Sequence, residues 1–230
     1  MISKHQDKQA LPQKRLVVLI SGGGSNLQSF IDQCASGDLK AKIVAVISNN
    51  PNAVGLNRAA SANIPNLIID HRNFHNRETF DQALSEMIDS FAPDLVILAG
   101  FMRILTTAFV NHFAGRLINI HPSLLPAYPG LHTHRRAIEA GDSEAGATVH
   151  FVTAELDGGP SIIQACVPIE KSDNEQSLAT KVLEFEHKIY PQAVGWFCDG
   201  RLCMGEGIAL LDNQPIPSSG IIFNPKANHT

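Results

Sequence analysis

The stretch Arg15-Leu-Val-Val-Leu-Ile20, followed by Ser21-Gly-Gly-Gly-Ser-Asn26, indicates the fold class of this chain. The first part is an almost unbroken apolar run rich in valine, leucine and isoleucine, which is typical of a parallel strand covered on both faces. The second part is a glycine turn, and the apolar residues after it recur at helical spacing: Leu27, Phe30, Ile31 and Cys34. A strand that passes through a tight turn into an amphipathic helix predicts an α/β protein.

Apolar runs and helical patterns alternate along the rest of the chain. The expected strands are 15–20, 42–48, 66–69, 94–99, 117–121, 147–152 and 161–167. The expected later helices are 55–62, 80–91, 107–113, 133–140 and 174–197, the last with Pro191 as a potential kink. This alternation predicts a single α/β domain with a doubly wound, mostly parallel sheet. The last two strands are expected to form a hairpin, and a final hairpin is expected from Gly205 on.

Size and charge restrict the classes of function. The chain has 230 residues, a hydrophobic fraction of 44% and a net charge of -4, which suits a globular protein with one large domain or at most two small ones. We expect residues 1–14 to be a flexible N-terminal extension, 15–212 to be the catalytic domain and 213–230 to be a C-terminal tail. Because no basic block is present, nucleic acid and anionic membranes are not expected as partners. Small-molecule substrates are expected instead.

The location is predicted from segments that the sequence lacks. No apolar run approaches the roughly 20 residues that a membrane-spanning helix needs, and residues 1–14 lack the apolar centre of a signal peptide. The four cysteines are not spaced as CxxC, which favours reduced thiols and argues against a cysteine-type zinc site: Cys34, Cys166, Cys198 and Cys203. A cytoplasmic protein is therefore expected.

The stretch Leu117-Ile-Asn-Ile-His-Pro-Ser-Leu-Leu-Pro126 is the best candidate for chemistry. Side chains two apart on a strand share a face, so Asn119 and His121 are expected to point the same way. Pro122 ends the strand and stiffens the loop that follows. An amide and an imidazole held side by side can polarise a carbonyl and move a proton. Taken alone, such a histidine is more often structural than catalytic.

The glycine turn at residues 21–26 has two interpretations. Its bare amide groups can close around an anion at a helix N-terminus, which suits a phosphate monoester. Alternatively, the glycines only permit a tight turn. A dinucleotide fingerprint is not present, because Leu27 replaces the third glycine and the second strand ends in Asn49 and Asn50 instead of an acidic residue.

An acidic loop, Glu155-Leu-Asp-Gly-Gly-Pro160, follows the sixth expected strand. If Asp157 lies beside His121, its carboxylate orients the ring and stabilises the protonated form. A loop with two glycines is also able to close over a substrate. The alternative is that Asp157 caps a turn, as aspartate often does.

Together these motifs resemble those of the formyltransferases that use 10-formyltetrahydrofolate. The resemblance rests first on residues 119–126 together with Asp157. The stretches at 21–28, 99–105 and 128–134 narrow it to members that formylate glycinamide ribonucleotide in purine biosynthesis. It covers about residues 15–212. This chain has Gly-Gly-Gly where those proteins commonly have a central asparagine, and its N-terminal extension is longer than usual.

The resemblance implies a Rossmann-like formyltransferase fold and direct formyl transfer without a metal. It assigns His121 as the general acid, Asn119 as a donor to the oxyanion and Asp157 as the residue that favours protonated His121. The implied ribonucleotide-binding residues are Gly24, Ser25, Asn26, Leu27, Leu183 and Glu186. The implied folate-binding residues are Arg77, Met102, Arg103, Ile104, Leu105, Asn119, Thr153, Ala154, Glu155, Leu156 and Asp157. A monomer or a homodimer is expected.

Other functions remain as alternatives. A formyltetrahydrofolate hydrolase would use the same three residues, but such enzymes usually carry an additional N-terminal regulatory domain. Methionyl-tRNA formyltransferases carry a C-terminal tRNA-binding domain and more positive charge. A metal-dependent hydrolase would need a ligand set whose spacing matches no known metal pattern: His121, His132, His134, His150 and Asp157. A non-catalytic nucleotide-binding module is a further class.

Overall fold

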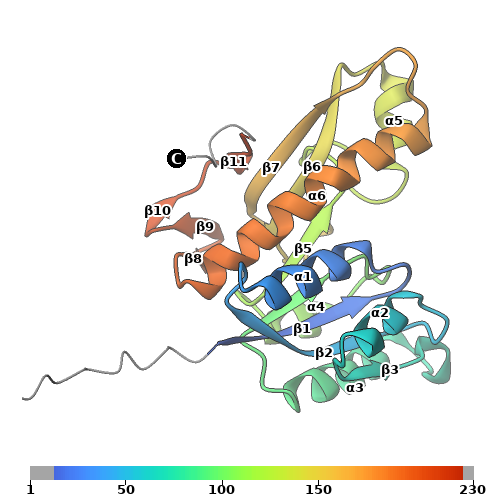
Figure 1. Cartoon of the computed structure of the whole chain (residues 1–230), viewed down its shortest axis with the longest axis vertical. Coiled ribbons are helices and arrows are strands. Elements are labelled where there is room, and N and C mark those ends of the chain that lie inside the picture. Colours follow the sequence, from blue (N-terminus) through green and yellow to red (C-terminus); the bar gives the residue numbers. More distant parts are fainter. Residues whose placement is uncertain (1–12, 225–230) are drawn as a thin grey trace, which may run out of the picture.

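The computed structural model of this chain describes residues 13–224. Two parts of the expected extension and tail, residues 1–12 and 225–230, lie outside the described residues. The centre of the molecule is an eight-stranded sheet in the order β11-β7-β6-β5-β4-β1-β2-β3 (Figure 1). Helices flank this sheet on both faces, so the predicted single-domain α/β fold with a mostly parallel sheet is confirmed.

The first half of the chain is the parallel, doubly wound part. Its strands all pair in parallel: β1 (Lys14–Ile20), β2 (Ala41–Ser48), β3 (Asn66–Ile68), β4 (Leu95–Leu98) and β5 (Leu117–His121). The helices between them are α1 (Ser25–Ser36), α2 (Gly55–Ser61), the short 3-10 helix η1 (His71–Asn73), α3 (Arg77–Asp89) and α4 (Thr107–His112). The winding reverses between β1 and β4. In such sheets ligands bind beyond the carboxyl ends of the strands at this reversal.

The second half adds antiparallel pairing. Its elements are α5 (Thr133–Ala140), β6 (Glu144–Phe151), β7 (Ser161–Pro168) and α6 (Glu175–Cys198). Strand β6 is antiparallel to both β5 and β7, which confirms the predicted hairpin. Helix α6 continues through Pro191 to Cys198.

The C-terminal strands differ from the expectation. A hairpin was expected from Gly205 on, but the small antiparallel sheet begins earlier and has three strands: β8 (Leu202–Gly205), β9 (Ile208–Leu211) and β10 (Gln214–Pro215). Strand β11 (Ile221–Ile222) then joins the main sheet in parallel with β7. Two residues are too few for a hydrophobic period, so the sequence pattern does not reveal β11. The boundary between catalytic domain and tail stays a prediction.

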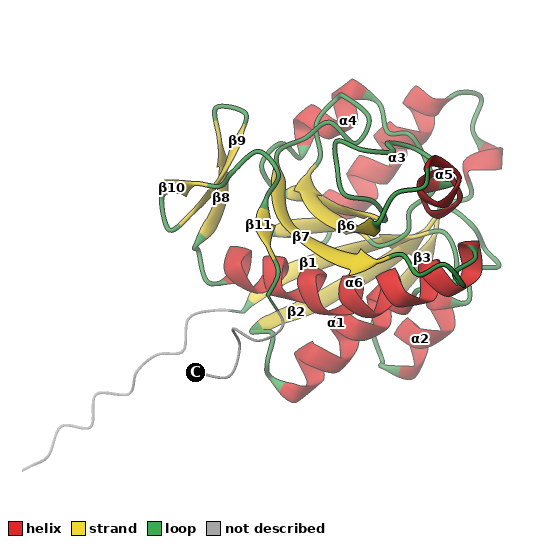
Figure 2. Ribbon diagram, turned by 90° about the horizontal axis from the view of Figure 1, so that it is seen from above, coloured by secondary structure: helices red, strands yellow, loops and turns green. Residues whose placement is uncertain are grey.

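The hydrophobic core has two parts, one on each face of the sheet. Helices α1, α2 and α6 cover one face, and α3 and α4 cover the other (Figure 2). The alternation along β5 divides its side chains accordingly. Ile118 and Ile120 pack on the α1 and α6 side, whereas Leu117 packs on the α3 and α4 side.

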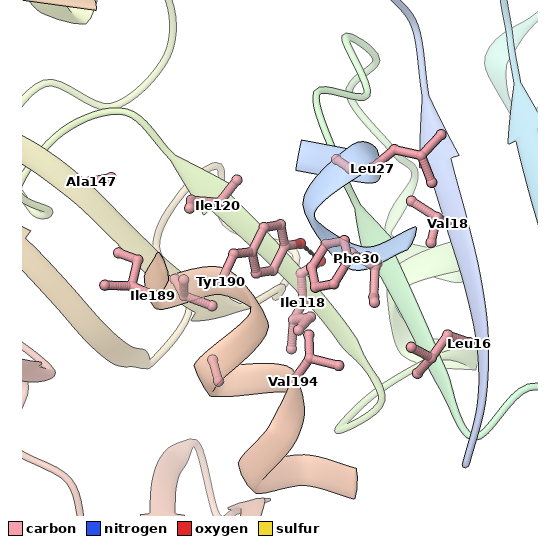
Figure 3. Packing of buried hydrophobic residues seen from close by; sticks show 14 of the residues in the cluster. Leu16, Val18, Leu27, Phe30, Ile118, Ile120, Ala147, Ile189, Tyr190 and Val194 are labelled. Atoms are coloured by element: carbon pink, nitrogen blue, oxygen red, sulfur yellow. Dashed lines mark hydrogen bonds between the residues drawn. The ribbon is translucent and has the colours of Figure 1, made fainter. Parts of the chain in front are cut away.

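Tyr190 fixes α6 against the centre of the sheet. Its ring lies 5.0 Å from that of Phe30 on α1, in an edge-on arrangement (Figure 3). Its hydroxyl is fully buried and lies 3.0 Å from Leu98 O and 3.1 Å from Ile118 O, so its hydrogen is shared by two neighbouring strands. A buried hydroxyl needs such partners because its desolvation is costly. The anchor lies directly before Asn119 and therefore positions α6 beside the end of β5.

Candidate active site

Strand β5 presents two polar side chains on one face, as the two-residue period predicts. Asn119 is half-buried and His121 is buried. Both lie on the same side of the strand as Leu117, which belongs to the core beneath α3 and α4. The antiparallel neighbour β6 places His150 opposite Asn119 and Thr148 opposite His121.

His150 orients the Asn119 amide. Its Nδ1 lies 2.9 Å from Phe151 O, and a carbonyl only accepts, so Nδ1 carries the hydrogen. Burial lowers the pKa of His150, which favours a neutral ring whose Nε2 accepts. Asn119 Nδ2 therefore donates to His150 Nε2 at 3.2 Å. This contact directs one N–H of the amide toward His150 on β6. The second N–H and the carbonyl of the amide stay available for other partners.

His121 lies between a backbone carbonyl and a carboxylate. Its Nε2 donates to Tyr128 O at 2.9 Å. Its Nδ1 lies 3.5 Å from Asp157 Oδ2, which is longer than an ordinary hydrogen bond. When the ring carries a proton on Nδ1, the Asp157 carboxylate attracts this proton, but the distance is too long for a strong hydrogen bond. A ligand oxygen can therefore compete for this proton.

Asp157 reaches His121 because its loop is closely constrained. Its backbone is left-handed, with φ at 52°, and its Oδ2 accepts from Gly130 N at 2.8 Å. A side chain at Gly159 would place its Cβ 1.8 Å from Phe151 O, so only glycine fits there. The expected proximity of Asp157 to His121 is thus present, and the carboxylate also caps the loop that carries Tyr128 and Gly130.

A cleft of about 140 Å³ lies beside Asn119, on the α3 and α4 side of the sheet. It brings together most of the predicted folate-binding residues: Asn119, Arg103, Ile104, Leu105, Thr153, Ala154, Glu155, Leu156 and Asp157. His150, Leu98, Phe101, Val110 and Val152 complete its lining. Two predicted residues, Met102 and Arg77, do not line the cleft. Met102 is 71% exposed, and Arg77 is exposed at the start of α3.

Arg103 offers this cleft a hydrogen-bond donor. Its guanidinium lies 5.3 Å from the centre of the Phe80 ring, which restrains the side chain. Its Nε is buried and finds no acceptor among the described residues. Since buried donors are almost always paired, a ligand acceptor at this position would satisfy it.

The glycine turn after β1 ends at the N-terminus of α1. Gly24 takes a left-handed conformation with φ at 70°, and no side chain caps the helix. The amides of Ser25, Asn26 and Leu27 belong to the first turn, where no intrahelical acceptor exists, so they can face an anion. The Leu27 side chain is itself buried in the core, which leaves only its backbone for a ligand.

Glu186 on α6 faces this turn across the carboxyl end of the sheet. Its Oε2 accepts from Asn26 Nδ2 at 2.7 Å, and the side chain is buried. Burial raises the pKa of Glu186, although the hydrogen bond from Asn26 opposes this shift. Leu183 lies half-buried one turn earlier on the same helix. The structure thus brings the predicted Asn26 and Glu186 into contact.

Comparison with known proteins identifies the family. The formyl transferase family model matches residues 14–194. The chain belongs to the formyl transferase family. It is 55% identical over 205 residues to phosphoribosylglycinamide formyltransferase of Escherichia coli, which covers 89% of this chain and 97% of that protein.

Solved structures of similar proteins have the same fold. Phosphoribosylglycinamide formyltransferase of Coxiella burnetii has a TM-score of 0.89 and 48% identity, covering 93% of this chain and 100% of its own. A formyltetrahydrofolate deformylase of Pseudomonas putida is also similar, with a TM-score of 0.77 and 26% identity. It covers 87% of this chain but 70% of its own length. The structural neighbours of this chain therefore carry the names of two activities, a formyltransferase and a deformylase.

A larger hollow, about 660 Å³, lies away from this site of the formyl transferase fold. It is at the amino ends of β1 and β2 and is lined by parts of α1 and by residues 62–65. Its lining contains no imidazole and no carboxylate. Imidazole and carboxylate groups are among the commonest general acids and bases in enzymes, so size alone does not make this hollow the reaction site.

The groups proposed as metal ligands are arranged differently. Within residues 13–224, no group of three or more histidine, cysteine, aspartate or glutamate side chains is placed to hold a metal ion. The two ring nitrogens of His150 face Asn119 and Phe151, and His132 is exposed.

None of the helices in the described chain combines the length and hydropathy needed to cross a bilayer.

Two contributions to the site were not predicted from the sequence. His150 was considered only as a metal ligand, but it is the partner of Asn119. The backbone of Tyr128 and Gly130 was not considered, although it binds His121 and Asp157. The only sequence signal for His150 was its place in an apolar run, where a polar residue needs a partner. The register that supplies this partner is a tertiary property.

Proposed function

We propose that this chain transfers the formyl group from 10-formyltetrahydrofolate to the amine of glycinamide ribonucleotide. The products are formylglycinamide ribonucleotide and tetrahydrofolate, a step of purine biosynthesis. The observation that carries the proposal is that Asn119 and Asp157 line one cleft and that His121 lies 3.5 Å from Asp157, in a member of the formyl transferase family. The 55% identity to the Escherichia coli phosphoribosylglycinamide formyltransferase supports this acceptor.

The two ligands would approach the strand ends from opposite faces of the sheet. The cleft beside Asn119 lies on the α3 and α4 side and suits the folate. We assign the folate to its lining residues and to Met102 and Arg77 at its periphery. Asn26 and Glu186 lie on the α1 and α6 side and suit the ribonucleotide. Asn119 would lie between the two ligands, next to the formyl carbon that is transferred.

The ribonucleotide would bind through two kinds of contact. Its phosphate suits the backbone amides from Gly24 to Leu27, because unpaired amides at a helix N-terminus favour an anion. Its amine suits Glu186, since a buried carboxylate gains most from a nearby amino group. We place Leu183 beside the same substrate on the basis of its position on α6.

The reaction then needs a donor to an oxyanion and a proton donor. The neutral amine attacks the formyl carbon, which forms a C–N bond and converts the carbonyl oxygen into an oxyanion. Asn119 Nδ2 and protonated His121 are suited to hold this oxyanion, while Asp157 stabilises the charged ring. The attacking nitrogen then loses a proton, the folate nitrogen gains one, and the oxyanion returns to a carbonyl as the C–N bond to the folate breaks. Proton transfer of this kind contributes about 10² to 10⁴ in rate.

We also infer that the protein works in the cytoplasm. The four cysteines are free in the structure, which fits a reducing compartment. A monomer or a homodimer stays a prediction.

The function is tested by following 10-formyltetrahydrofolate, or a stable analogue, by absorbance with and without glycinamide ribonucleotide. We expect loss of the formyl group only when the ribonucleotide is present, together with formylglycinamide ribonucleotide in the product mixture. Equal loss without the ribonucleotide would identify a hydrolase, the activity named for the similar Pseudomonas putida protein. No loss in either reaction would contradict the transferase assignment.

A further inference from the structure

Helix α2 binds two backbone carbonyl groups of the glycine turn. Gly55 N donates to Gly22 O at 3.0 Å. Arg58 Nε donates to Gly23 O at 2.9 Å. Two successive carbonyls are therefore bound by α2, on one side of the turn. A carbonyl facing an anion would repel it, so their removal leaves the amides of the turn as its anion-facing groups.

The turn and α2 are packed so closely that their relative position is fixed. A Cβ at Gly24 would lie 2.8 Å from Gly55 Cα, and a Cβ at Gly55 would lie 2.6 Å from Ile20 Cδ1. The same Gly24 position is 3.5 Å from Arg58 Cδ, so the arginine side chain runs along the turn. Contact of this kind allows a side chain on α2 to control the geometry of the turn.

The guanidinium of Arg58 has no acidic partner. Its Nη1 donates to Gln28 Oε1 at 3.1 Å, which is a neutral acceptor on α1. Within the described residues, no carboxylate forms an ion pair with Arg58. The pKa of His187 on α6 is lowered, first by burial and second by the charge of Arg58, so the guanidinium acts across the gap between the turn and α6. An unneutralised positive charge therefore lies beside the amides of the turn.

We propose that Arg58 is a positioning residue that makes the glycine turn selective for a phosphate monoester. Its Nε holds the Gly23 carbonyl toward α2, and its charge, which no carboxylate among the described residues neutralises, favours a dianion near the amides of the turn. This inference rests on the proposed function, in which that phosphate belongs to the ribonucleotide. It adds a residue that lies outside the motifs of the glycine turn and the β5 end.

The test compares two substrates in the wild type, Arg58→Gln and Arg58→Lys. One substrate is glycinamide ribonucleotide and the other is glycinamide riboside, which lacks the phosphate. For Arg58→Gln we expect kcat/KM with the ribonucleotide to fall by about 10- to 100-fold, mainly through KM, because the Gly23 carbonyl is no longer held and the positive charge beside the turn is lost. The value for the riboside should stay within about twofold. Arg58→Lys keeps the charge and should recover part of the selectivity.

Arg201→Gln is the matched control, because Arg201 is an exposed arginine that pairs with Asp212 far from the turn. This variant should have the same kcat/KM as the wild type with both substrates. An equal fall for both substrates in Arg58→Gln would indicate general damage to the structure and would overturn the inference. Unchanged selectivity would overturn it as well.

A second measurement separates this inference from the proposed function. Titration calorimetry with ribose 5-phosphate should show binding to the wild type and at least tenfold weaker binding to Arg58→Gln. If the wild type does not formylate the ribonucleotide but this difference is found, the proposed function fails and the role of Arg58 stands. If ribose 5-phosphate binds both proteins equally, the role of Arg58 fails, whatever the activity.

Discussion

The glycine turn after β1 and the end of β5 lie at the same edge of one sheet, but they offer ligands different chemical groups. The turn offers backbone amides, and its own side chains carry no charge. The end of β5 offers Asn119 and His121, which are oriented by side chains and carbonyls from other segments. The backbone amides of the turn suit the binding of a group whose charge does not change during the reaction. A reaction that moves a proton needs side chains such as those at the end of β5.

This difference predicts opposite sensitivities to substitution. In the turn, what matters is the space occupied by added atoms, because a Cβ at Gly24 would lie 2.8 Å from Gly55 Cα. At the end of β5, what matters is the functional group that is removed, because the fold there is supported by the core behind Ile118 and Ile120.

His121→Ala should have the largest effect on turnover. We expect kcat to fall by about 10² to 10⁴-fold, because a proton donor and a positive charge near the oxyanion are both lost. Steady-state kinetics gives kcat, and thermal unfolding with circular dichroism checks that the fold survives. A variant with near wild-type kcat would remove His121 from the mechanism.

Asp157→Asn should have a smaller effect on turnover. We expect kcat to fall by about 100-fold, since the amide no longer stabilises protonated His121 but can still accept from Gly130 N. Asp142→Asn, which changes an exposed carboxylate bonded to the Tyr128 hydroxyl, is the control. Equal kinetics of the two variants would mean that proximity to His121 is not what matters.

Gly24→Ala tests the backbone side of the comparison. The left-handed conformation and the approach of Gly55 should lower the free energy of unfolding by about 1–3 kcal/mol. We also expect a higher KM for glycinamide ribonucleotide and an unchanged KM for the folate. Urea unfolding and two-substrate kinetics measure these effects. An equal rise in both KM values would contradict a local role for the turn.

Glu186→Gln should change how stability depends on pH. Burial raises the pKa of Glu186 above its ordinary value of 4.5, so the folded state holds this proton more tightly than the unfolded state. The stabilisation from that proton is complete below 4.5 and is lost as pH rises through the folded-state pKa. Glutamine cannot ionise, so the melting temperature of the variant relative to wild type should rise with pH from about 4 to 7. A constant difference would mean that the carboxyl is not destabilised by burial.

Arg201→Gln should have the smallest effect, because both partners of the Arg201–Asp212 pair are about half exposed. We expect only a small loss in the free energy of unfolding and no change in kcat, because solvent screens exposed ion pairs. The same unfolding and kinetic measurements apply. A large loss would show that β8 and β9 depend on this pair.

Local patterns predicted the elements that carry the site. The apolar run before Ser21 predicted β1, and the two-residue period at 117–121 predicted that Asn119 and His121 share a face. These features are local, because side-chain direction in a strand depends only on the backbone of that strand. The C-terminal strands were predicted less well, since β10 and β11 have only two residues each.

The amino-acid sequence by itself determined the α/β alternation, the glycine turn before α1 and the direction of the polar side chains on β5. The tertiary structure alone decided that His150 meets Asn119, that Asp157 meets His121 and that α2 binds the carbonyls of the glycine turn. The physical reason is range. Strand direction and helix starts follow from neighbouring residues, whereas sheet register and helix packing depend on how the whole core is filled.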